Sequence, residues 1–251
     1  GQHNTGATYA ISLSGSTSIT AGTGVTLESL TDNTGTIALL SSGGIDGGSG
    51  TVLMRAANYA FGGADRTITT TGVLTIEPDA DENSFASSFD NQYLNPVSVT
   101  GLTLGKSSNA SAITLSRAIS LSGPVSIYGG SIDVNANITA NSGNILLDAD
   151  TGSTLNQSST GILLDDVITI ETVTSGNLTL IGRSGDTGSG FDGIDASSAN
   201  TTTLRSAGNL TLQGYSYAAS GSGRGVDLNN DVIAASGTVS MSGQHNTGAT
   251  Y

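Results

Sequence analysis

The feature that most constrains the fold is a short phrase that recurs along the 251-residue chain. Its clearest form is Ser-Gly-Asn-Leu-Thr-Leu-Ile-Gly at 175–182, and variants occur at 142–149, 207–214 and 236–243. Each copy places small polar turn residues before a short run in which apolar and small polar residues mostly alternate. This alternation is typical of a β-strand with one buried face. A chain that repeats one strand and one turn builds a solenoid.

Three strands make up each coil of this repeat. A leading strand begins at Ile45, Ile132, Ile162, Ile194 and Val226, each near an aspartate, and the last four follow one another at a nearly constant step. A middle strand follows, and the Ser-Gly-Asn phrase with its own strand closes the coil. Three short strands separated by Gly, Asn and Ser corners are typical of a parallel β-helix. We therefore predict an all-β fold, a right-handed parallel β-helix (β-solenoid) with about eight coils in the span from Gly1 to its repeat at Gly243.

The alternation also predicts which side chains of the phrase point inward. These residues should stack on one another from coil to coil and form a continuous apolar ladder. The predicted core ladder consists of Ile145, Leu147, Leu178, Leu180, Leu210, Leu212 and Val239.

A second repeat joins the two ends of the sequence. Residues 1–9 and 243–251 are identical. In a solenoid such a duplication is typical of a tandem array, and the alternative is a duplicated terminal tag. We interpret residues 1–251 as a single β-solenoid unit that holds one period, 1–242, and an overlap, 243–251, into the next. This interpretation predicts end-to-end contact with neighbouring copies of the same repeat.

Three stretches interrupt the pattern and carry aromatic residues. The largest is 77–96, which we predict to be a loop insertion, and the others are 58–66 and 213–224. Insertions in a solenoid bulge from one face, which is often the binding face. Exposed aromatic rings beside carboxylates suit lateral packing between fibres or contact with surface glycans. The candidate contact residues are Tyr59, Phe61, Phe85, Phe89, Tyr93, Tyr215 and Tyr217.

Acidic residues gather at several turns, and calcium prefers such oxygen ligands. The sequence lacks a recurring Gly-Gly-x-Gly-x-Asp pattern, which is the calcium-binding β-roll repeat. Solvated turn carboxylates explain the groups better than calcium does, so we predict no cofactor. The three groups are Asp79, Asp81 and Glu82; Asp148 and Asp150; and Asp186, Asp192 and Asp195.

The catalytic case is weak. The only histidines are His3 and His245, which occupy the same repeat position. Neither has a Ser or Asp partner at a spacing that indicates a catalytic group. A polysaccharide-degrading enzyme would need grouped carboxylates, and Asp192 with Asp195 is one such pair. Corner or strand-end aspartates are far commoner, so we expect a protein that is not an enzyme.

Composition and charge exclude other classes. Charged residues are only 11% of the chain, against about 25% in typical domains. A net charge of −13 with few basic residues disfavours nucleic acid and anionic membrane surfaces. No apolar run reaches the ~18 residues of a membrane-spanning helix, so we predict no membrane insertion.

The stretch Ala-Asn-Ile-Thr-Ala-Asn-Ser-Gly-Asn-Ile-Leu-Leu-Asp-Ala at 136–149 resembles the repeats of the filamentous-haemagglutinin family. These proteins are bacterial two-partner-secreted β-helical exoproteins. The resemblance covers most of the chain outside 77–96, and it implies an exported rod on the bacterial cell surface or shed from it. Family members usually have degenerate repeats, so an exact return of the sequence at 243–251 is a departure.

Together these features predict a structural repeat unit of a long extracellular bacterial fibre with an adhesive or cell-linking role. The alternative is an adhesin that binds a ligand or glycan through 77–96, and a polysaccharide-degrading β-helix enzyme is the least favoured function.

Overall fold

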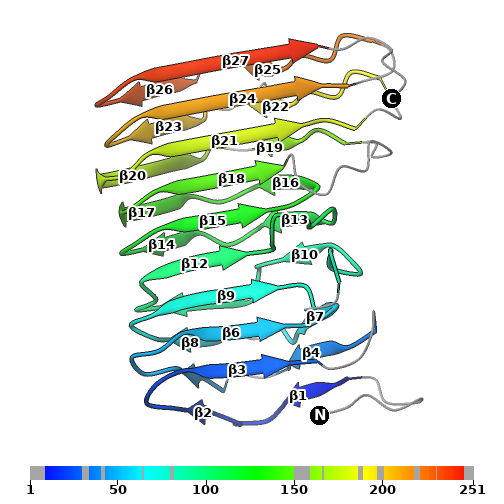
Figure 1. Cartoon of the computed structure of the whole chain (residues 1–251), viewed down its shortest axis with the longest axis vertical. Helices are drawn as coiled ribbons and strands as arrows, with labels where there is room; N and C mark the ends of the chain where they lie inside the picture. Colours follow the sequence, from blue (N-terminus) through cyan, green and yellow to red (C-terminus); the bar gives the residue numbers. More distant parts are fainter. Residues whose placement is uncertain are drawn as a thin grey trace.

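The chain folds as a right-handed parallel β-helix (Figure 1). In the described residues it forms 27 short strands and no helix, and neighbouring strands within each sheet are parallel. Strand residues dominate because glycine and β-branched residues disfavour a helix. The computed structural model describes residues 9–29, 34–40, 43–63, 65–79, 82–149, 159–165, 167–185, 189–196, 201–217, 221–229 and 231–245.

Successive coils place their three strands on three faces. Face 3 is one nine-stranded sheet that runs the length of the rod. Its strands are β3 (Val25–Glu28), β6 (Val52–Arg55), β9 (Val73–Glu77), β12 (Gly101–Leu104), β15 (Val125–Tyr128), β18 (Ile145–Ala149), β21 (Leu178–Arg183), β24 (Leu210–Ser216) and β27 (Val239–His245).

Face 1 consists of two sheets that do not pair with each other. The first contains β1 (Ile11–Leu13), β4 (Thr36–Leu39) and β7 (Asn58–Phe61). The second contains β10 (Phe89–Asp90), β13 (Ala112–Leu115), β16 (Ser131–Val134), β19 (Ile162–Leu164), β22 (Ile194–Ala196) and β25 (Val226–Leu228).

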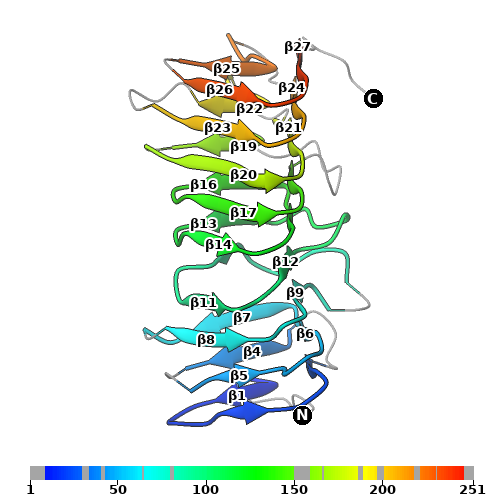
Figure 2. The same ribbon diagram turned by 90° about the vertical axis from the view of Figure 1, so that its left-hand side faces the viewer.

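Face 2 is also divided, one coil further along the rod (Figure 2). Its first sheet contains β2 (Ile19–Thr20), β5 (Ile45–Asp46), β8 (Arg66–Thr69) and β11 (Leu94–Val97). Its second sheet contains β14 (Ile119–Leu121), β17 (Ile138–Ser142), β20 (Thr169–Ser175), β23 (Thr203–Ser206) and β26 (Val232–Ala235).

The predicted register of the second half is confirmed. Ile132, Ile162, Ile194 and Val226 are direct neighbours on face 1. Ile45 does not join them, because β5 lies on face 2 and pairs with β2 and β8. The Gly-Ile-Asp pattern around Ile45 does not identify a face, because a strand on any of the three faces can follow a glycine corner.

The coils are less uniform than the sequence repeat indicates. On face 3 the step from Ile145 to Leu178 is long, whereas the step from Val125 to Ile145 is much shorter. Because several coils are this short, face 3 holds nine strands, one more than the number of coils predicted.

The core is a narrow column between the three faces. Six of the predicted ladder residues are 0% exposed: Ile145, Leu147, Leu178, Leu180, Leu210 and Leu212. Val239 continues this column into β27, the last strand of face 3, where it is 40% exposed. At the other end of face 3, Val25 and Leu27 in β3 are only 6% and 8% exposed, so the column is open to solvent chiefly at β27.

The Ser-Gly-Asn corner has its own hydrogen-bonded ladder. Asn144 Oδ1 accepts from the backbone N–H of Asn177, and Asn177 Oδ1 accepts from that of Asn209, both at 2.8 Å. Asn209 Oδ1 accepts from Thr238 N–H at 2.9 Å. These side chains continue the bonding between coils through a turn, where the backbone bends away from the sheet.

Gly176 shows why the corner requires glycine. Its φ is +110°, and a Cβ at this position would lie 1.9 Å from the carbonyl oxygen of Gly143 in the preceding coil. Side chains are excluded both by the dihedral angle and by the close stacking of the corners.

We expect Gly176→Ala to destabilise the rod more than Gly190→Ala does. Gly190 has a φ of +75° and no atom within 4 Å of an added Cβ, so alanine there meets only the backbone penalty of about 1–2 kcal/mol. Gly176→Ala adds a clash that costs about 1–3 kcal/mol more. Urea unfolding of both variants measures the difference, and equal midpoints would contradict the stacked corner.

Candidate functional site

The two halves of face 1 separate between β7 and β10, and we call this place the split. After β9 the chain does not return directly to face 1, and it reaches β10 only at Phe89. The backbone N–H of Ala86 donates to the carbonyl of Ala57 at 2.8 Å, so the intervening segment packs back on the start of β7. The first sheet of face 1 therefore ends at β7 and the second begins at β10 (Figure 1).

In the structure, the loops are shorter than the sequence predicted. Glu77 belongs to β9, and β10 and the start of β11 lie inside 77–96, so much of this range continues the coil. Tyr59 and Phe61 lie in β7, and Tyr215 lies in β24. The prediction that these three aromatic residues lie in loops is wrong. Aromatic side chains fit the pleated surface of a strand.

Four aromatic rings fill the split. Those of Tyr59, Phe61, Phe85 and Phe89 lie with centroids 5.6–6.4 Å apart, in stacked and edge-to-face pairs. Phe85 and Phe89 are each 3% exposed and belong to the core, which corrects their prediction as exposed contact residues. Large rings occupy this place because the separated sheets leave a volume that small side chains would not fill.

A cavity of about 210 Å³ opens over these rings. It brings together five of the seven predicted contact residues, including the half-buried Tyr93. Its lining consists of Ala57, Asn58, Tyr59, Phe61, Phe85, Ser87, Ser88, Phe89, Asp90, Gln92 and Tyr93.

The two other predicted contact residues lie elsewhere on the rod. Tyr215 is near the end of β24 on face 3, and Tyr217 follows that strand. The guanidinium carbon of Arg183 lies 5.2 Å from the centre of the Tyr217 ring, within the range of a cation–π interaction.

The cavity is apolar at its base and polar at its rim. Ser87 Oγ donates to Asn58 Oδ1 at 2.9 Å, and the backbone N–H of Gln92 donates to Asp90 Oδ1 at 2.9 Å. Burial raises the pKa of Tyr59 well above its usual value, so its hydroxyl stays protonated and donates to the carbonyl of Glu77 at 3.0 Å. Among the described residues that line the cavity, Asp90 alone has a charged side chain at neutral pH.

Polar side chains connect the coils where the sheets are divided. Asn91 spans the division of face 2: its Nδ2 donates to the carbonyl of Arg117, and its Oδ1 accepts from the N–H of Arg117, both at 2.9 Å. Asn109 accepts from Phe85 N–H at 3.2 Å and donates to the carbonyl of Tyr128 at 2.9 Å. Asn91 thus bridges the division between β11 and β14, and Asn109 joins the coil before it to the coil after it.

A buried arginine supports the first half of the rod. Arg66 in β8 is 0% exposed, and its guanidinium donates to the carbonyls of Gly43 at 2.5 Å and Leu13 at 3.2 Å. Sequence reasoning missed Arg66, Asn91 and Asn109. Pro96 in β11 was a usable signal for the division of face 2, because a proline has no N–H for a ladder and favours edge strands.

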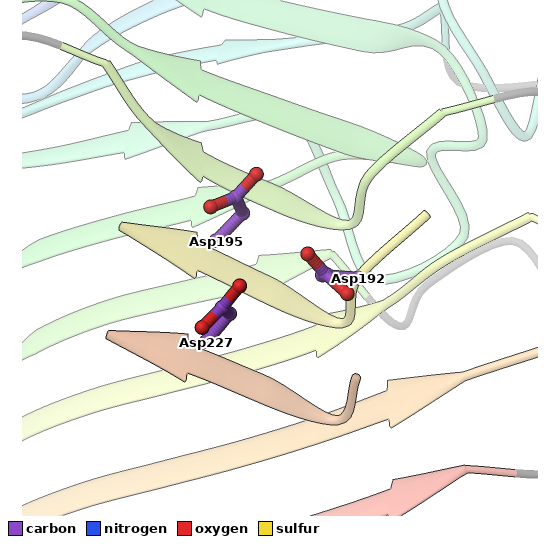
Figure 3. Close-up of side chains that lie close together, drawn as sticks. All are labelled: Asp192, Asp195 and Asp227. Atoms are coloured by element: carbon purple, nitrogen blue, oxygen red, sulfur yellow. The ribbon is translucent and has the colours of Figure 1, made fainter. Parts of the chain in front are cut away.

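A second cluster lies on face 1 in the last coils (Figure 3). Carboxylate oxygens of Asp192, Asp195 and Asp227 all lie within 4.8 Å of one another. Asp195 and Asp227 are register neighbours, a relation that the repeat contains although our acidic groups omitted Asp227. These three residues could supply oxygen ligands to a cation.

Arg224 supplies positive charge to this cluster. Its guanidinium forms an ion pair with Asp227, and its backbone N–H donates to Asp192. Burial raises the pKa of Asp192, and the charges of Asp195 and Asp227 raise it further. The cluster is therefore a group of like charges that one arginine partly compensates.

The other predicted chemical groups are dispersed or outside the described residues. His245 is exposed at the end of β27. His3, Asp81, Asp150 and Asp186 lie outside the described residues, as do most residues of the duplicated segments 1–9 and 243–251.

No protein-family model, curated protein or solved structure matches this chain. Among the described residues, no helix is long and apolar enough to cross a membrane.

We expect Asn91→Ala to destabilise the protein by about 1–3 kcal/mol, because it leaves the N–H and carbonyl of Arg117 without their side-chain partner. Asn95→Ala on β11 is the matched control, since Asn95 is half-buried nearby and its loss removes no bridge to β14. Urea midpoints measure both changes, and an equal effect would mean that Asn91 does not bridge the division.

We expect Asp192→Asn to stabilise the protein at pH 7 by about 0.2–1 kcal/mol, the scale of cross-strand charge pairs. The amide keeps an oxygen acceptor for Arg224 N–H and removes one of three like charges. Because the native pKa of Asp192 is raised above its ordinary 3.8, the native state binds the proton more tightly, and stability falls as pH rises through that window.

The advantage of Asp192→Asn should therefore disappear below pH ~3.8, where Asp192 is protonated in both states. Unfolding at pH 3 and pH 7 in the presence of EDTA measures this, with Asp148→Asn as the control outside the cluster. A less stable asparagine variant at pH 7 would show that the carboxylate of Asp192 is favourable.

Proposed function

We propose that the chain is a structural period of a long extracellular bacterial β-helical fibre, in which copies of the repeat stack end to end. The repeat of residues 1–9 at 243–251 carries this proposal, and the last strand of the rod is compatible with it. Val239 and Met241 in β27 continue the columns of Leu210 and Leu212, yet they are 40% and 54% exposed. The equivalent ladder positions of β18, β21 and β24, which have a coil on both sides, are buried, so the open end is complementary to a further coil.

The sequence repeat supplies a coil of suitable length. In a tandem array, residue 243 takes the place of Gly1 of the following copy. The step from Val239 to Val25 of that copy then lies between the short and the long steps already described for face 3.

The two other faces give nearly the same step. Ile11 of the following copy would continue face 1 after Val226, and Ile19 would continue face 2 after Ile233. Both steps are almost equal to the one on face 3, so all three faces would come into register together.

A stacked array of this kind would be long and uniform. Nine coils at about 4.8 Å each give roughly 43 Å per period. Each junction would pair the exposed edge of β27 with β3, so face 3 would continue through the fibre without an open edge.

The resemblance of 136–149 to filamentous-haemagglutinin repeats supports an exported, surface-attached rod with an adhesive or cell-linking role. The low content of charged residues and the absence of cysteine are compatible with such a rod outside the cell. Stiffness and the presentation of side-chain clusters at a fixed axial spacing would be its contribution.

The proposal predicts that Val239→Asp has different effects in one period and in two. In residues 1–251 position 239 is 40% exposed, so the aspartate keeps part of its hydration and should cost about 1 kcal/mol. In a chain of two consecutive periods, with the change in the first, it would be buried at the junction and cost about 2 kcal/mol or more. Amide hydrogen exchange of β27 measures both.

Val167→Asp is the control, because Val167 is 69% exposed on the side of the rod and should be neutral in both chains. In electron micrographs, the unmodified two-period chain should appear as one straight rod of roughly 86 Å. Two separate short particles joined by a linker, or unprotected β27 amides in the two-period chain, would overturn the end-to-end stacking.

A further inference from the structure

We propose that the cavity at the split binds one ring of a neutral sugar. The cavity is formed by β7, β10 and the segment between Phe85 and Tyr93, so it depends on the division of face 1 and not on the ends of the rod. The proposal is therefore independent of the proposed fibre.

The size of the cavity limits the ligand to a small group. Its volume of about 210 Å³ is below the ~300–1,000 Å³ of pockets that enclose drug-sized molecules. One pyranose ring of a longer glycan suits this volume, with the rest of the chain directed to solvent.

The base of the cavity suits the apolar side of a pyranose. Four packed rings hold one another in fixed orientations, and Tyr93 adds a fifth at the wall. The C–H bonds on one side of a pyranose pack well against aromatic rings, and rings fixed by the core lose little conformational entropy when a ligand binds.

The rim suits the hydroxyl groups of the same ligand. Asn58, Ser87, Ser88 and Gln92 provide neutral donors and acceptors around the opening. The N–H groups of Asn58 and Gly62 donate to the preceding coil at 3.0 and 2.9 Å. In a parallel ladder bonding directions alternate, so the intervening backbone groups of Tyr59 and Phe61 face the split.

Charge selects the class of sugar. Among the described residues, no Lys or Arg lines the cavity, and the single carboxylate of Asp90 repels anions. An acidic sugar would lack a counter-charge here, whereas the carboxylate of Asp90 can accept hydrogen bonds from two neighbouring hydroxyls. Neutral polar groups outnumber this carboxylate at the rim, which favours a neutral polyhydroxyl ligand over a cation.

The test is saturation-transfer NMR of residues 1–251 with the methyl glycosides of glucose, galactose, mannose and N-acetylglucosamine. Choline and N-acetylneuraminic acid serve as cationic and anionic probes. We expect transfer from at least one neutral glycoside, with millimolar affinity. Tyr93→Ala should weaken it about tenfold and Gln92→Ala severalfold, because they remove one wall and one rim donor.

Tyr215→Ala is the matched control, since it removes an equally half-buried tyrosine outside the cavity and should leave binding unchanged. Circular dichroism and urea unfolding identify any variant that fails to fold, and Asp90→Asn, on the exposed rim, provides a further folded variant. No transfer from any neutral glycoside, transfer that the cavity variants do not weaken, or transfer from choline or N-acetylneuraminic acid alone would each overturn the proposal.

Discussion

Backbone hydrogen bonding between successive coils is the interaction on which this structure depends. Most inner strands pair with the coil before and the coil after them, so a thin column of Ile, Leu and Val side chains is sufficient as a core. The same requirement explains the corners: Gly176 allows close stacking, and the asparagine side chains extend the bonding through the turn. At β27, which pairs with β24 alone, the apolar positions of the core column are exposed.

Where this pairing is interrupted, side-chain hydrogen bonds connect the coils. The aromatic cluster and the cavity also lie there. Asn91 forms hydrogen bonds across the division of face 2, where β11 and β14 do not pair. Aromatic rings occupy the volume between β7 and β10, and the cavity lies over them. The division between β7 and β10 therefore removes backbone hydrogen bonds between two coils. In return it provides a concave site, lined by aromatic rings and polar groups, that a uniform solenoid lacks.

Sequence reasoning succeeded where the coil length is nearly constant. The steps between Ile132 and Val226 are almost equal, and the structure pairs the residues at these steps directly. In the first half the steps are shorter and irregular, such as that from Val52 to Leu74, so Ile45 was assigned to the wrong face. The aromatic residues of the site were found as interruptions of the repeat. Their burial and the bridging role of Asn91 were not, because these depend on where two sheets separate, which no local pattern records.

The rod and the cavity also bear on each other. A cavity that holds a single sugar ring would bind weakly, because so small a ligand offers few contacts to offset the loss of its freedom. On a fibre with a period of roughly 43 Å, identical cavities would follow one another along a stiff axis. A surface that carries many copies of one glycan could then engage several cavities at once, and each further contact would benefit from the effective concentration that the rod imposes. Weak single sites on a rigid periodic support are thus a physically consistent route to firm attachment.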